Sequence, residues 1–230
     1  MIENIDILKA VYETLLMSVI SLVLAYIVGL PLGILLKVTS KTGLKPNKIV
    51  NLILGAIVNF LRSVPCLIIT VILLPFTRLV LGKGTGAWYT MIIPLFFSSF
   101  AYVARIVEQS LTDVDNGKIE AIKSMGASDF MIVMKVLIPE ARSSLLLGVC
   151  VTFVNIIGYT SFAYNIGAGG LISQIYSYYM GHSKNFETSP VFWLLIVIVV
   201  IIVEVIQELG LYLAKKLDKR RILKWKRTYF

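Results

Sequence analysis

Charged residues are scarce in this sequence of 230 residues. Asp, Glu, Lys and Arg together make up 15% of it, hydrophobic residues make up 57%, and the mean hydropathy is +0.85. Because a soluble domain carries roughly 25% charged residues to cover its surface, the composition excludes an ordinary soluble globular protein.

Residues that carry chemistry are scarce as well. The sequence has one histidine and two cysteines, Cys66 and Cys150, and both cysteines lie in apolar segments with no metal-binding or redox spacing. No Gly-x4-Gly-Lys-Ser/Thr phosphate loop is present. We therefore predict a protein with no catalytic residue, no metal and no cofactor of its own, which does not hydrolyse ATP by that route.

Long apolar runs are what the sequence has in abundance. Charge-free segments occupy 14–36, 49–61, 63–77, 84–104, 143–183 and 188–203. A helix needs about 20 apolar residues to cross a hydrocarbon core of about 30 Å. We therefore predict an all-α integral membrane protein that forms one domain over 1–230. The predicted spans lie near 13–37, 49–80, 87–110, 139–163 and 189–214, with a loop over 111–138 and a basic tail over 215–230.

The distribution of Lys and Arg predicts the orientation. With the N-terminus outside, 17 of the 22 basic residues fall on the inner side, 4 fall on the outer side, and Arg62 lies within a span. Basic residues concentrate in cytoplasmic segments, so the sequence predicts an external N-terminus and a cytoplasmic C-terminus. The net charge of +9 is then a topology signal and gives no reason to expect nucleic acid as a partner.

The predicted loop over 111–138 is of mixed polarity. The pattern predicts a short helix over 117–125 with an apolar edge formed by Ile119, Ile122 and Met125. Gly126 is a natural helix stop, because glycine tolerates the left-handed conformation. Ser128 or Asp129 is a suitable cap for a second short helix. Two such helices fit either a protein partner or a lipid surface.

The loop resembles the EAA loop of bacterial ABC importer permeases. Glu120-Ala121, Gly126 and Pro139 fall at the spacing of that motif, while Ile122 replaces its second alanine. The wider chain resembles the methionine-uptake members of the family. The segments that carry this likeness are Arg62-Ser63-Val64-Pro65, Pro75-Phe76-Thr77-Arg78, Ala104-Arg105 with Glu108, Gly158-Tyr159 and Gly167-Ala168-Gly169-Gly170-Leu171.

The resemblance implies the partners and the function. It implies a homodimeric pore in the bacterial inner membrane, two cytoplasmic ATP-binding subunits that bind the ATP, and an external substrate-binding protein. The cargo it implies is methionine or a close analogue. The residues it implies for contact with the ATP-binding subunits are Glu120, Ala121, Met125, Gly126, Phe130 and Pro139.

Polar residues inside the apolar spans are candidates for gating. Arg62 is predicted either near the membrane centre, facing protein or water, or at a shallower depth on a tilted helix that also contains Pro65. Glu204, in the last span, is its candidate partner. Asn155, Tyr159 and Ser161 line a pathway in one interpretation and bond neighbouring helices in the other.

Two questions are left open by the sequence. Gly29 and Gly33 predict either a close helix contact or, with Pro31, a kink in the first span. An ion-coupled secondary transporter that uses Arg62 and Glu204 is the alternative function, although such folds usually have two repeated halves and no repeat is evident here. A membrane-embedded enzyme is disfavoured because residues that carry chemistry are so few.

Overall fold

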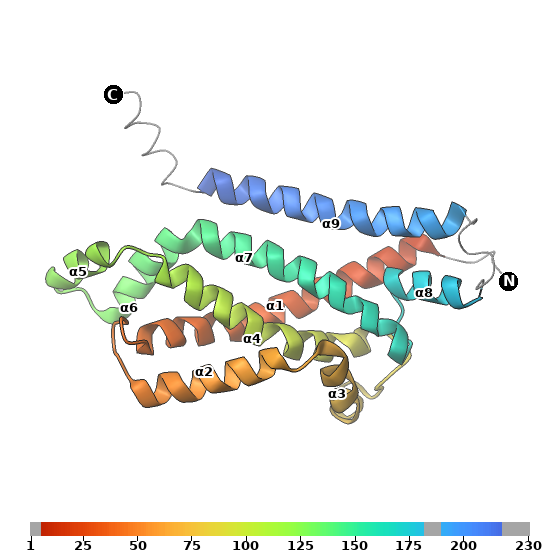
Figure 1. Cartoon of the computed structure of the whole chain (residues 1–230), viewed down its shortest axis with the longest axis horizontal. Helices are drawn as coiled ribbons and strands as arrows, with labels where there is room; N and C mark the ends of the chain where they lie inside the picture. The colour runs from red at the N-terminus through yellow and green to blue at the C-terminus, as the bar shows by residue number, and fades with distance from the viewer. Residues whose placement is uncertain (1–5, 182–189, 218–230) are drawn as a thin grey trace, which may run out of the picture.

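The computed structural model describes residues 6–181 and 190–217, and all the regular secondary structure in these two ranges is helical. The elements are α1 (Ile7–Thr39), α2 (Lys48–Ser63), α3 (Cys66–Leu81), η1 (Trp88–Met91), α4 (Ile92–Thr112), α5 (Asn116–Ser124), α6 (Asp129–Ile132), η2 (Val133–Leu137), α7 (Ile138–Tyr159), η3 (Thr160–Ile166), α8 (Leu171–Gly181) and α9 (Pro190–Leu217). The long helices lie side by side along one axis (Figure 1). Most of the predicted basic tail, residues 218–230, lies outside the described part.

Four helical segments are long and apolar enough to cross a membrane. They are α1, η1 with α4, the continuous segment Asp129–Ile166, and α9. The pair α2 and α3 passes the same test only when taken together, which gives up to five spans. This agrees with the prediction of an all-α protein with about five spans.

The predicted span over 49–80 is not one continuous helix, because the chain breaks at Val64 and Pro65. Val64 is extended (φ −82°, ψ 122°), and the axes of α2 and α3 differ by 101°. Proline disfavours the helical conformation in the residue before it and has no N–H to donate. The Pro65 carbonyl accepts the N–H groups of Ile68 and Ile69, at 2.9 and 3.1 Å, and so starts α3.

A close and extensive helix contact joins α1 to α4 and is made at two glycines. A methyl group on Gly29 would lie 2.7 Å from the Phe100 carbonyl oxygen, and one on Gly33 would lie 2.5 Å from the Ala104 carbonyl oxygen. Helix backbones approach this closely only where small residues stand between them. The structure thus contains the close contact, and α1 remains helical through Pro31.

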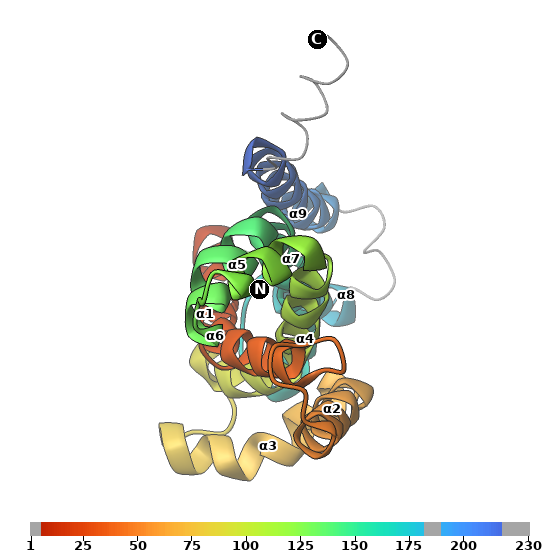
Figure 2. The ribbon, with the colours of Figure 1, turned by 90° about the vertical axis from the view of Figure 1, so that its left-hand side faces the viewer.

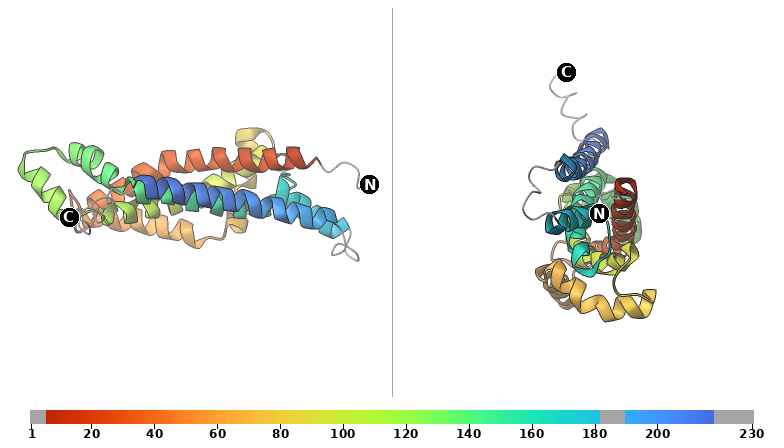
Figure 3. Two further views of the ribbon diagram at one scale, coloured as in Figure 1. Left: turned by 90° about the horizontal axis from the view of Figure 1, so that it is seen from above. Right: turned by 90° about the vertical axis from the view of Figure 1, so that its right-hand side faces the viewer.

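The remaining helices flank this central pair. Figures 2 and 3 show α9 on one side of the bundle, next to α7, and α2 with α3 on the opposite side. Two side chains of α7 bind the end of α9. Arg142 Nε donates to the Leu217 carbonyl at 3.1 Å, and Ser143 Oγ donates to the Ala214 carbonyl at 2.8 Å.

The two ends of the bundle differ. One end carries α5 and α6, and the other carries α8 and the start of α1 (Figure 1). At the α8 end, the Gly170 N–H donates to the Glu13 carboxylate at 3.0 Å, and the Leu171 N–H donates to Thr14 Oγ1 at 2.7 Å. The loop before α8 is therefore attached to α1.

Candidate functional site

The short helix expected over 117–125 is present as α5. Its start is capped by Asp115, whose carboxylate accepts the Gly117 N–H at 2.9 Å. Its end is closed by two backbone bonds, Gly126 N–H to the Lys123 carbonyl at 3.0 Å and Ala127 N–H to the Ile122 carbonyl at 3.4 Å. Gly126 has φ +83°, the left-handed conformation that this helix-closing motif requires.

The second short helix differs from the expectation. Ser128 Oγ accepts the Met131 N–H at 3.3 Å and caps α6 as predicted, but α6 then runs through η2, a π-helical turn, directly into α7. The segment Asp129–Ile166 is helical throughout its 38 residues. A π turn is a local change of helical bonding pattern, and here it lies just before Pro139, whose ring would otherwise end or kink the helix. The span therefore does not begin afresh at Pro139.

The three residues of the apolar edge expected on α5 do not all face the same way: two pack into the core and one is exposed. Ile119 is buried and Ile122 is half-buried, and both pack into the core cluster that contains Val114, Ile132 and Leu137. Met125 is instead 84% exposed, because it is the C-cap residue, after the last full turn. Together with Phe130, which is 75% exposed, it projects from the end of the bundle. We call the exposed residues Glu120, Ala121, Met125, Gly126 and Phe130 the loop face.

Two ion pairs connect the elements of the loop face to the rest of the chain. Lys118 Nζ lies 2.6 Å from a Glu140 carboxylate oxygen of α7, and Lys45 Nζ lies 3.4 Å from Asp129. Both pairs are partly exposed, and such pairs contribute about 0–1 kcal/mol each. The position of α5 therefore depends mainly on the burial of its apolar side chains.

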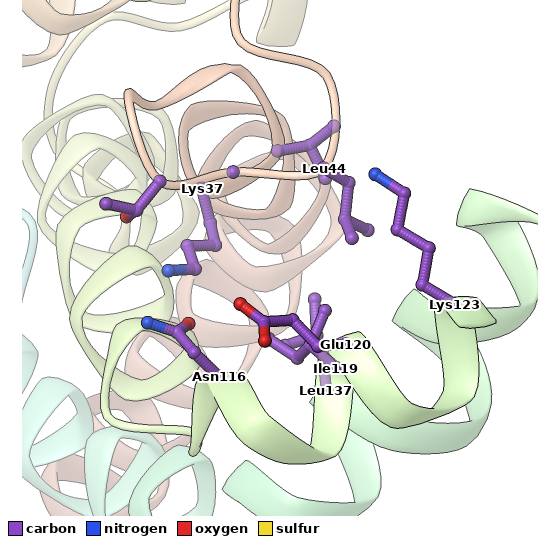
Figure 4. Close-up of a pocket in the computed structure, with 10 residues that line it drawn as sticks. Lys37, Leu44, Asn116, Ile119, Glu120, Lys123 and Leu137 are labelled. Atoms are coloured by element: carbon purple, nitrogen blue, oxygen red, sulfur yellow. The ribbon is translucent and has the colours of Figure 1, made fainter.

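Behind the loop face lies a polar cavity of about 340 Å³ between α5 and the end of α1. Figure 4 shows the Glu120 carboxylate directed across this cavity toward the Lys37 side chain, whose ammonium lies on the side of Asn116. Lys123 lies on the rim, and its ammonium points away from Glu120. Lys37 is only 3% exposed. Lys37 is one of the 17 basic residues predicted on the inner side, and no local pattern in the sequence distinguishes it from the others.

A second polar cluster lies between α2 and α4. The Arg105 guanidinium pairs with Glu108 and donates to Asn59 Oδ1 at 2.8 Å, which connects α4 to α2. Arg62, at the end of α2, lies with its guanidinium carbon 5.9 Å from the centre of the Tyr102 ring. The three charged groups lie beside a cavity of about 340 Å³ lined by Arg62, Arg105, Glu108, Gln109, Thr112 and Asp113.

The structure does not bring Arg62 and Glu204 together in one chain. Arg62 lies on α2 and the exposed Glu204 lies on α9, and these helices are on opposite sides of the bundle (Figure 2). In residues 6–181 and 190–217 neither side chain takes part in an ion pair. The intrachain pair expected from the sequence is therefore wrong, because periodicity along the chain does not show which faces of two distant helices meet.

The other intramembrane candidates are dispersed. Tyr159 is half-buried against the core cluster of Met17, Met91 and Leu95, and it lies within electrostatic reach of Arg62. Asn155 lines a crevice of about 250 Å³ between α7 and α9. Ser161 is half-buried in η3. These three side chains do not converge on one site in the described chain, and no group of three metal-ligating residues is present in that part either.

A bundle of apolar helices with an exposed loop face at one end is the architecture of a membrane transport protein. Comparison with known protein families also identifies a membrane transport component. The model of the binding-protein-dependent transport system inner membrane component family matches residues 29–219. The chain belongs to this family and is an inner-membrane protein.

The relatives narrow the class. The chain is 41% identical over 220 residues to the methionine import system permease protein MetP of Bacillus subtilis, covering 94% of this chain and 97% of the relative. It is 39% identical over 208 residues to a probable D-methionine transport system permease protein MetI of Pasteurella multocida, covering 90% and 94%.

Solved structures agree. An inward-facing structure of the MetNI methionine ABC transporter contains a chain that matches with a TM-score of 0.85 at 35% identity, covering 91% of this chain and 95% of that one. An amino acid ABC transporter with histidines matches with a TM-score of 0.72 at 19% identity, which shows a shared fold.

Proposed function

We propose that this chain is the pore-forming permease subunit of an ATP-driven importer for methionine or a close analogue. Two copies form the pore, two separate cytoplasmic subunits bind and hydrolyse ATP, and an external binding protein delivers the cargo. The loop face is the surface on which the ATP-binding subunits act. The ion-coupled alternative loses its support, since its charged pair, Arg62 and Glu204, is not formed in the chain.

The observation that carries the proposal is the exposure of Met125 and Phe130 at a rigidly built corner. Large apolar side chains that project from the polar end of a membrane protein indicate a contact with a partner. The corner is held by the capped turn at Gly126, and the segment that follows it is helical without interruption as far as Ile166. Force applied at Phe130 is therefore carried into the membrane through backbone hydrogen bonds.

The transport assay that tests the proposal uses the chain co-expressed with its candidate ATP-binding subunit. We expect the two to co-purify and, in proteoliposomes with the binding protein outside, to accumulate labelled methionine only when ATP is supplied to the ATP-binding subunits. Uptake that follows an imposed proton or sodium gradient without ATP would contradict the proposal. Vesicles with a Walker-lysine variant of the ATP-binding subunit are the matched control.

The proposed orientation is tested by cysteine labelling. In a background without Cys66 and Cys150, the exposed positions chosen are Lys83→Cys and Gly181→Cys for the outer side and Thr42→Cys and Ser124→Cys for the inner side. We expect an impermeant maleimide to label the first two in intact cells and the last two only after permeabilisation, because the Lys and Arg excess lies with the latter. Labelling of Ser124→Cys in intact cells would place the loop face outside and overturn the coupling role.

A further inference from the structure

The cavity behind the loop face contains a charged group whose environment needs an explanation. Lys37 lies in the last turn of α1 and is 3% exposed, and within the described ranges its ammonium makes no hydrogen bond and no ion pair. The ammonium itself opens onto the cavity, and a charge so little exposed to bulk water is stabilised when a carboxylate accompanies it. Its ammonium points into the cavity, so a partner is available only from the groups that line this space or lie close behind it (Figure 4).

Two carboxylates are candidates for this ammonium, one that acts on it electrostatically and one that lines the same cavity. Glu108 of α4 acts on Lys37 electrostatically, but its carboxylate is already paired with Arg105. Glu120 of α5 lines the same cavity and directs its carboxylate toward Lys37, and no ion pair of Glu120 is formed within the described chain (Figure 4). Of the two, Glu120 is therefore the carboxylate that forms no ion pair in the described chain and lines the same cavity as Lys37.

We infer that Lys37 is a positioning residue for coupling, whose ammonium receives the Glu120 carboxylate when the cavity between α5 and α1 closes. The closed pair fixes the loop face to the end of α1, and the open arrangement described above releases it. Because α1 is seated on α4 through Gly29 and Gly33, a displacement of α5 is then passed to the two central helices of the bundle. This inference rests on the proposed coupling role of the loop face.

The test compares transport with ATP hydrolysis in reconstituted complexes. We expect Lys37→Met and Glu120→Gln each to lower methionine uptake per ATP hydrolysed by about tenfold, within the 5–150-fold range of ordinary coupling between sites. The double variant should be no worse than either single variant, because one interaction is lost in all three. The reversed pair, Lys37→Glu with Glu120→Lys, should recover most of the coupling, which a merely structural loss would not allow.

Two control variants make the test specific. Lys123→Met removes an ammonium from the same cavity that points away from Glu120, and it should leave uptake per ATP unchanged. When Glu108→Gln is combined with Lys37→Met, the two reductions in methionine uptake per ATP hydrolysed should add. The inference is overturned if Lys37→Met leaves uptake per ATP at the original value. It is also overturned if the losses caused by Lys37→Met and Glu120→Gln add in the double variant while those of Lys37→Met and Glu108→Gln do not.

If Lys37→Met does not fold, cross-linking between positions 37 and 120 tests the closing of the cavity instead. Lys37→Cys and Glu120→Cys, in the background without native cysteines, should cross-link in one nucleotide state of the complex and not in the other. Equal cross-linking in both states, or none in either, would refute the closing of the cavity. Failure of the proposed function is recognised separately, because in that case the ATP-binding subunit does not co-purify with the unmodified chain.

Discussion

Gly126→Val is expected to abolish methionine uptake while the protein still inserts into the membrane and forms its dimer. A methyl group at this position would meet nothing within 4 Å in the chain, so the fold has room for the side chain. The backbone has φ +83°, however, and a residue with a Cβ pays about 1–2 kcal/mol in this conformation, more so when β-branched. The turn then reopens, and Met125 and Phe130 no longer project at a fixed angle.

Co-purification of the ATP-binding subunit, measured together with uptake, distinguishes this effect from misfolding. Gly126→Asn is the matched control, because asparagine adopts the left-handed conformation more readily than valine does. This variant should retain most of the co-purification and most of the uptake. Phe130→Ser should weaken co-purification without changing the turn. Glu120→Lys should reduce uptake less severely than Gly126→Val. If Gly126→Val co-purifies and transports normally, the loop face does not contact the ATP-binding subunit, and the interpretation as a surface that lies on lipid replaces it.

Gly33→Leu is expected to prevent the bundle from assembling. Even a methyl group would lie 2.5 Å from the Ala104 carbonyl and 2.6 Å from Val107 Cβ, so α1 and α4 would have to separate. Overpacking of this kind typically costs about 1–3 kcal/mol for a small group and more for a large one. We therefore expect Gly33→Ala to lower the thermal stability of the detergent-purified protein and Gly33→Leu to leave little monodisperse protein.

Gly158→Ala is the control for this prediction. Gly158 is also a helical glycine, at the end of α7, but a methyl group there would meet nothing within 4 Å. Alanine is favoured over glycine in a helix by about 1 kcal/mol, so this variant should be as stable as the original or more so. Equal stability of Gly33→Ala and Gly158→Ala, measured by the loss of monodisperse protein on heating, would show that α1 and α4 are not in close contact.

The sequence predicts well those features that depend on neighbouring residues. Helix α5 begins and ends within a residue of the expected positions, because Asp115 and Gly126 act on the backbone groups next to them. The spans are predicted by apolar length in the same local manner. The close contact at Gly29 and Gly33 was one of two alternatives, since small residues permit a close approach but do not choose the partner helix.

Features that depend on distant elements could not be predicted in this way. The break at Pro65 is a local effect of that proline, but the 101° angle between α2 and α3, which both contact α4, cannot be derived from neighbouring residues. Arg62 and Glu204 are both unusual in a span, but their separation follows from the positions of α2 and α9. Lys37 is one of many inner-side lysines until the fold places it opposite Glu120.

The uninterrupted helix from Asp129 to Ile166 has a consequence for leakage of ions. At about 1.5 Å per residue, its 38 residues extend for about 57 Å, more than the thickness of the hydrocarbon core. A flexible joint at the end of the span would absorb part of any movement, and one end of the pathway could then open before the other had closed. Here the end that carries the loop face is in one helical piece with η3, which leads into the glycine loop held by Glu13 and Thr14 of α1. In the proposed transporter, closing of one end would therefore accompany opening of the other, which shortens any interval in which a continuous water column joins the two sides of an energised membrane.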